Sequence, residues 1–149
     1  MTFGDRIPDE FWWPNLTAYN YRKTSDRSED YNCIAWAIDE ITVRIWPDEP
    51  GYFWPDTILQ PESTQAFIEY FTTYNYVVCE NGELEAGFEK IAIYVEDDEV
   101  THAAKQLQSG RWSSKLRIAL EDIEHDALEA LEASGYGRAT IFMRRPHTP

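Results

Sequence analysis

The segment that decides the fold runs from Lys90 to Leu116 and reads KIAIYVEDDEVTHAAKQLQSGRWSSKL. Residues that favour β-strands are interrupted by two turn signals, the acidic pair Asp97-Asp98 and the dipeptide Ser109-Gly110. The three strands expected from this pattern cover residues 91–95, 100–107 and 111–116. The segment therefore predicts a three-stranded antiparallel meander.

Helical spacing appears on both sides of this meander. Apolar residues recur every three or four positions from about Ser28 to Ile41, which predicts a helix with a buried face. A second helix is expected to begin after Pro61 with Ser63 or Thr64 as its cap, and a third covers residues 120–133. Strands are expected over residues 74–79 and 138–144. This order predicts an α+β fold in which N-terminal helices pack on an antiparallel β-sheet.

Length and composition limit the possible functions. The 149 residues predict a single domain spanning 1–149, with an irregular aromatic-rich arm at 1–27 and a frayed tail at 146–149. We find neither a secretory leader nor an apolar run long enough to cross a membrane, so the expected compartment is the cytoplasm. A formal charge of −14 disfavours nucleic acid and suits either a solvated surface or a basic protein partner. The oligomeric state stays open.

The two cysteines differ in their surroundings. Cys79 ends an apolar run and fits a buried strand position. Cys33 lies near the start of the first expected helix, where unpaired backbone N–H groups favour a thiolate. His102 lies on the second strand of the meander beside the small residues Ala103 and Ala104, which leave room for a helix that carries Cys33. These two residues are the candidate chemical centre.

Three short motifs carry a resemblance to known proteins. They are Asn32-Cys-Ile-Ala-Trp-Ala, Ile91-Ala-Ile-Tyr with Thr101-His-Ala-Ala, and Gly110-Arg-Trp-Ser-Ser-Lys-Leu with Asp122-Ile-Glu-His. A cysteine at a helix start followed by a histidine on a β-hairpin resembles the papain-like cysteine peptidases in their small bacterial forms, including the cell-wall amidohydrolases. The three motifs in this order are more closely similar to an uncharacterised family of small bacterial proteins. The resemblance implies a papain-like fold and a catalytic pair formed by Cys33 and His102.

A third polar group usually orients the imidazole of a Cys–His pair. A two-residue turn at 109–110 would place Gln106 opposite Ser113 and Ala104 opposite Lys115, and the strand carries no Asn or Asp. Asp122, and after it His125, are the preferred candidates beyond that strand, while Ser113, Ser114 and Lys115 are the local ones. The side chain of Asn32 is a candidate for oxyanion binding or for helix capping. In an intact pair, the Cys33 sulfur and a His102 ring nitrogen should lie within about 4 Å.

Two functions remain in competition at this point. One is a cysteine hydrolase or amide-transferring enzyme that acts on a peptide or other amide through Cys33 and His102. The other is a non-catalytic acidic binding protein, for example an inhibitor or immunity-type partner of a basic protein. The sequence lacks the motifs of nucleotide and metal sites, so no cofactor and no bound metal are expected.

Overall fold

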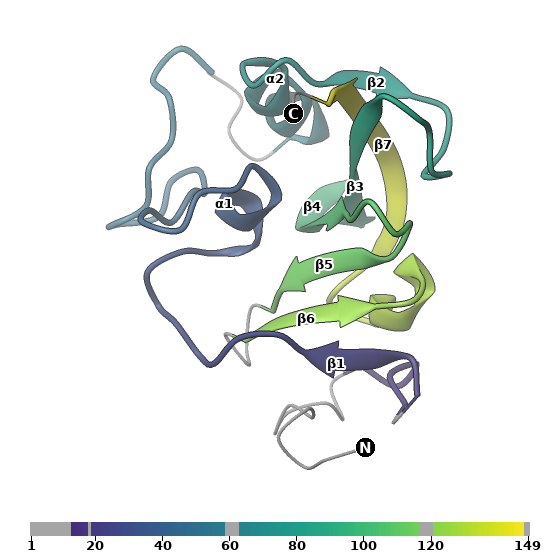
Figure 1. The fold of residues 1–149 in the computed structure, drawn as a ribbon. Helices are drawn as coiled ribbons and strands as arrows, with labels where there is room; N and C mark the ends of the chain where they lie inside the picture. The colour runs from purple at the N-terminus through teal and green to yellow at the C-terminus, as the bar shows by residue number, and fades with distance from the viewer. Residues whose placement is uncertain (1–12, 18, 59–62, 117–120, 148–149) are drawn as a thin grey trace.

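The computed structural model describes residues 13–17, 19–58, 63–116 and 121–147 (Figure 1). Its main feature is an antiparallel seven-stranded sheet in the order β1-β6-β5-β4-β3-β7-β2. The strands are β1 (Tyr21–Lys23), β2 (Val77–Cys79), β3 (Phe88–Glu96), β4 (Glu99–Gln106), β5 (Trp112–Lys115), β6 (Asp122–His125) and β7 (Arg138–Pro146). The helical elements are α1 (Cys33–Ala37), α2 (Thr64–Thr72) and the 3-10 helix η3 (Leu128–Leu131).

Two hydrophobic clusters cover the two faces of the sheet. The first contains residues of α1 and α2 together with Ile91, Ile93 and Ala103 of the sheet. The second contains Ala92, Tyr94 and Ala104, whose side chains alternate with those residues, and is closed by the N-terminal arm and η3. We call these the α1 face and the His102 face, because His102 is paired with Tyr94 across the two strands.

The papain-like α+β prediction, with N-terminal helices packed on the sheet, is wrong. The described residues form mainly a sheet, with α2 as the one substantial helix, and α1 is only five residues long. The first expected helix ends early because Asp39 adopts a left-handed conformation, with φ of 65°. The amide of Glu40 then bonds back to the carbonyl of Ala35, and Ile41 is left 54% exposed instead of buried.

The prediction of a helix over residues 120–133 is also wrong. Asp122–His125 instead forms β6, which pairs with β5 on one side and with β1 on the other. The helical propensity of this acidic, leucine-rich stretch is overridden because the pairing buries Ile123 and His125 on one face of a continuous sheet. Strand β1 lies inside the arm that was expected to be irregular.

Other expectations are confirmed. Ser63 caps α2 through a 3.0 Å hydrogen bond from the amide of Ala66. The strands of the meander and the final strand form, and β7 runs along β3. In the arm, Trp13 is buried in the second cluster with its ring edge-on to Tyr136. Residues 1–12 and 148–149, which include nearly half of the arm and the end of the expected tail, lie outside the described residues.

Candidate functional site

Cys33 is the first residue of α1, and Asn32 fixes its position. The Asn32 side-chain oxygen accepts hydrogen bonds from the amides of Ala35, at 3.2 Å, and Ile45, at 3.0 Å, and its Nδ2 donates to the carbonyl of Ile45 at 2.7 Å. Asn32 therefore caps the helix and ties it to the following loop. This explains its identity without an oxyanion role, because its amide oxygen and a side-chain hydrogen both hold backbone groups.

Trp36 anchors α1 to the sheet. Its ring nitrogen donates to the hydroxyl of Ser113 at 3.0 Å, and the ammonium of Lys105 lies 3.8 Å from the centre of its ring. Cys33, on the same short helix, is 3% exposed and belongs to the cluster on the α1 face. Helix, cysteine and Ser113 thus share one face of the sheet.

His102 lies on the opposite face and is fully buried. Its Nδ1 lies 2.9 Å from the hydroxyl of Tyr136, and its Nε2 lies 2.9 Å from the hydroxyl of Ser114. Both ring nitrogens are therefore engaged on the side of the sheet away from α1. The structure does not bring Cys33 and His102 together, and the expected sulfur–nitrogen contact within about 4 Å is not made.

Ser114 connects His102 to His125. Its hydroxyl lies 2.8 Å from Nε2 of His125, and Nδ1 of His125 lies 2.9 Å from the carbonyl of Ala127. The structure thus joins His102 to His125, the second-choice partner from the sequence, through a serine on the intervening strand. We call the chain Tyr136, His102, Ser114, His125 and the Ala127 carbonyl the histidine relay.

When both imidazoles are neutral, the position of each hydrogen in the histidine relay follows from which groups can donate and which can only accept. The Ala127 carbonyl can only accept, so Nδ1 of His125 carries the hydrogen and its Nε2 accepts from Ser114. The Ser114 oxygen is then free to accept from Nε2–H of His102. Nδ1 of His102 in turn accepts from the hydroxyl of Tyr136. The bonds all run in one direction, which is an arrangement in which hydrogen bonds strengthen one another.

Burial keeps the two imidazoles neutral. Loss of solvation places the pKa of His102 well below its ordinary value, and the neighbouring His125 lowers it further. Burial also lowers the pKa of His125 to about 4, despite its hydrogen bond to the Ala127 carbonyl, which favours the charged form. A general base for a thiol needs a pKa near neutrality and contact with the sulfur, and His102 has neither.

Asp122, the first-choice partner for His102, lies on the α1 face instead. One of its carboxylate oxygens accepts a 2.6 Å hydrogen bond from the hydroxyl of Tyr31. Burial, followed by this hydrogen bond, raises the pKa of Tyr31 to about 12. Lys115 is paired with Asp122 across β5 and β6, and its ammonium lies 4.2 Å from the centre of the Tyr31 ring.

A cavity of about 410 Å³ opens in front of Cys33. Its wall combines aromatic side chains, two carboxylates and two cations. The residues that matter below are Glu29, Arg44, Trp46, Glu49, Tyr52 and Lys115. The motifs in the sequence did not point to Arg44, which stands alone as a basic residue in an acidic segment.

The described ranges contain no cluster of three His, Cys, Asp or Glu side chains suited to a metal ion. Both cysteines are free thiols. None of the helices in these ranges is long and apolar enough to cross a bilayer.

Comparison with known families finds a match over most of the chain. Residues 22–144, which include the whole histidine relay and the cavity wall, match the family described as "Domain of unknown function (DUF7689)". The chain belongs to this family. No curated protein and no solved structure matches the chain. Membership of DUF7689 thus names the domain and leaves its function to be argued from the site.

Proposed function

We propose that this DUF7689 protein is a binding protein for a basic protein or peptide, which it contacts through an acidic aromatic surface beside α1. The surface is formed by residues 44–58, which we call the aromatic loop. The observation that carries the proposal is the combination of fixed aromatic side chains with exposed carboxylates on this loop. We keep the cytoplasm as its compartment, and the two free thiols fit a reducing environment.

The aromatic loop is held in place by the rest of the fold. The ring of Trp54 stacks on Tyr70 of α2 with a centroid distance of 5.2 Å, and Trp46 packs against Phe67 at 5.1 Å. A short parallel bridge between Ile45 and Phe53 closes the loop on itself. A surface that is already ordered loses little conformational entropy when a partner binds.

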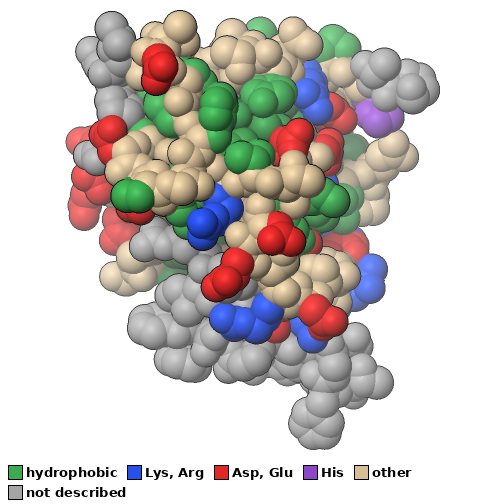
Figure 2. Space-filling model, turned by 90° about the vertical axis from the view of Figure 1, so that its left-hand side faces the viewer, with side chains coloured by type: hydrophobic (Ala, Val, Ile, Leu, Met, Phe, Trp, Pro, Cys, Tyr) green, Lys and Arg blue, Asp and Glu red, His purple; other side chains and the backbone are tan. Residues whose placement is uncertain are grey.

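Apart from Arg44 at its start, the charged residues of the aromatic loop are all acidic. Asp48, Glu49 and Asp56 are exposed, and they line a second hollow of about 500 Å³ together with Trp46 and Tyr52. Phe53 is 50% exposed on the same loop. Figure 2 looks onto this side of the molecule and shows acidic side chains next to hydrophobic ones, with a few basic side chains among them. Aromatic anchors with a charged rim are typical of protein interfaces, and this rim complements a basic partner.

The hydrolase hypothesis receives less support. Cys33 does line a cavity, but the histidine that would activate it lies behind the sheet with both nitrogens bonded to Tyr136 and Ser114. From this position His102 cannot take the proton of the Cys33 thiol. We therefore favour binding over catalysis.

A cationic peptide tests the proposal. The probe is a fluorescein-labelled, C-terminally amidated peptide of alternating arginine and glycine, and binding is followed by fluorescence anisotropy at several salt concentrations. The triple variant Asp48→Asn/Glu49→Gln/Asp56→Asn should weaken binding at least tenfold. The matched control Glu80→Gln/Glu83→Gln/Glu129→Gln changes the net charge equally at exposed positions elsewhere and should bind as the wild type does. Equal losses in both variants, or no binding at low salt, would refute a specific surface.

A further inference from the structure

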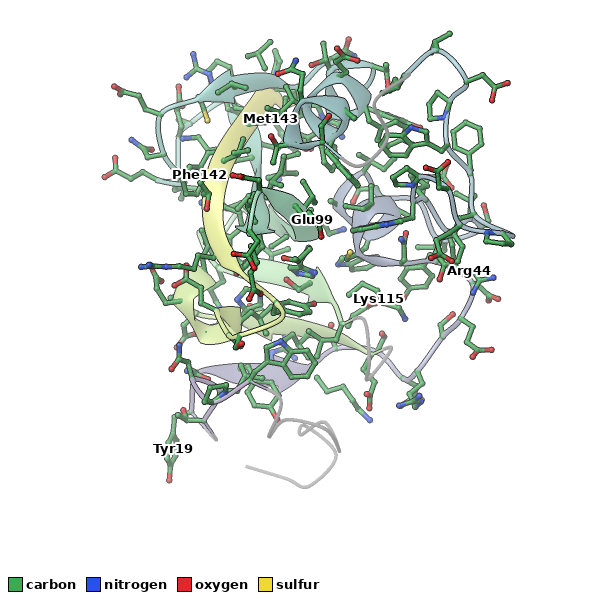
Figure 3. All side chains as sticks on the ribbon, turned by 180° about the vertical axis from the view of Figure 1, so that it is seen from behind. Tyr19, Arg44, Glu99, Lys115, Phe142 and Met143 are labelled. Carbon is green, nitrogen blue, oxygen red and sulfur yellow. The ribbon has the colours of Figure 1, made fainter. Side chains whose placement is uncertain are left out.

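The cavity in front of Cys33 has an electrostatic character that differs from the rest of this acidic chain. Two cations, Arg44 and Lys115, reach its wall from different elements. Figure 3 shows their side chains on the same side of the molecule. The volume of the cavity, about 410 Å³, lies in the range of small-ligand sites, about 300–1,000 Å³.

Arg44 is the more informative of the two cations. Its guanidinium lies over the ring of Tyr52, 4.5 Å from the ring centre, and within the described ranges it forms no ion pair with a carboxylate. A Cβ atom on Gly51 would lie 3.5 Å from Nη2 of Arg44, so the guanidinium packs closely over this glycine, whose φ is +84°. Stacking fixes the plane of the guanidinium while its edge can still donate two parallel hydrogen bonds.

Lys115 supplies the second positive charge. Its side chain is fully buried, and its ammonium is held near the Tyr31 ring. Burial lowers the pKa of Lys115 despite the opposing influence of Asp122 and Glu121. The positive charge of Lys115 adds to that of Arg44 in attracting an anion to the cavity.

We propose that the cavity binds a ligand through a carboxylate group, held by the edge of the Arg44 guanidinium and by the charge of Lys115, and that this ligand is the C-terminal end of a peptide. The planar fork of arginine matches both oxygens of a carboxylate. Glu29 and Glu49 also line the cavity and would repel a second negative charge, so the rest of the ligand is neutral or positive. Trp46 and Tyr52 provide apolar contact for the terminal side chain.

The test compares acetyl-Ala-Ala, which has a free carboxylate, with its C-terminal amide, using calorimetry and the tryptophan fluorescence that Trp46 contributes. The acid should bind, and the amide should bind at least tenfold more weakly. Arg44→Gln should weaken binding of the acid at least tenfold, while Arg138→Gln, at a largely exposed side chain at the start of β7, should leave it unchanged.

Equal binding of acid and amide would overturn the proposal, as would an unchanged affinity in Arg44→Gln or no binding of the acid at millimolar concentrations. Far-ultraviolet circular dichroism of each variant checks that it is folded. If Arg44→Gln does not fold, Arg44→Lys keeps the charge but loses the fork and should bind the acid several-fold more weakly. This probe is uncharged at its N-terminal end and the cationic probe above is amidated, so either proposal can fail while the other stands.

Discussion

The two faces of the sheet differ in how their polar side chains are bonded. On the His102 face, Tyr136, His102, Ser114 and His125 pass hydrogen bonds to one another until the Ala127 carbonyl ends the chain. On the α1 face, charged side chains border a cavity, and Arg44 has no carboxylate within ion-pair distance in the described ranges. The comparison teaches that the histidines serve the fold, while the groups available to a ligand lie with Cys33.

Acid should destabilise the protein through the histidine relay, and this is the largest effect we expect. Both folded pKa values lie below the unfolded value of about 6.5, so the unfolded chain binds more protons below that pH. Stability is therefore lost as pH falls from about 6.5 towards 4, by about 3 kcal/mol for His125 with a further loss for His102. Urea unfolding at a series of pH values measures it.

His125→Gln and His147→Gln serve as comparisons for this pH dependence. The first should flatten the stability profile between pH 6.5 and 4.5, whereas the second changes a partly exposed histidine near the C-terminus and should not. A wild-type profile that is flat over this interval would show that the buried imidazoles are not held neutral.

The second-largest effect that we expect is the loss of stability when Ser114, at the centre of the relay, is replaced. Ser114→Ala leaves Nε2–H of His102 and Nε2 of His125 buried without partners, which should cost about 2–4 kcal/mol. Ser113→Ala removes one hydrogen bond from Trp36 on the other face and should cost about 1 kcal/mol. Denaturant unfolding of both variants compares the faces directly. A Ser113→Ala loss equal to or larger than that of Ser114→Ala contradicts our description of the relay.

These serines also show how far the sequence could be interpreted. The meander, the Ser63 cap and the final strand were predictable because alternation and turn residues are local signals. The register between β4 and β5 was not, because the connection contains three residues, 108–110, rather than two: the amide of Leu107 bonds to the carbonyl of Arg111 at 2.7 Å. Lys105 therefore pairs with Ser113, and Gln106 with Trp112.

A shift of one residue moves every side chain to the other face. It places Ser114 beside His102 and sends Ser113 and Lys115 to the α1 face. The placement of Cys33 and His102 on opposite faces depends on the path of the chain between them. A local sequence pattern does not predict that path. Tyr136 carries no sequence signal for its contact with His102, because it lies 34 residues away in a loop.

Replacing Asn32, which caps α1, should have a smaller effect on stability. Asn32→Ala removes three hydrogen bonds, one that caps α1 at Ala35 and two that join it to Ile45, and should cost about 1–2 kcal/mol. Asn32→Asp keeps the two acceptor contacts and loses only the donation to the Ile45 carbonyl, so its thermal stability should lie between that of Asn32→Ala and the wild type. Asn32→Asp at or below Asn32→Ala would mean that the cap matters less than the amide donor.

The smallest effect that we expect is on the reactivity of the Cys33 thiol when His102 is replaced. Cys33 is buried and lacks a histidine partner, whereas Cys79 is partly exposed, so iodoacetamide should modify Cys79 first. His102→Gln should leave the rate at Cys33 unchanged in protein that circular dichroism shows to be folded. Mass spectrometry of timed samples gives both rates. A rate at Cys33 that is fast near neutral pH and drops in His102→Gln would restore the Cys–His pair.

The central claim, that His102 belongs to the relay and not to Cys33, is tested most directly by nitrogen NMR of the imidazole rings. We predict that His102 carries its hydrogen on Nε2 and His125 on Nδ1, that both stay neutral from pH 8 to 6, and that Cys33→Ser changes neither tautomer. A His102 ring that is charged near neutral pH, or one whose tautomer changes when the Cys33 sulfur is removed, would contradict this account.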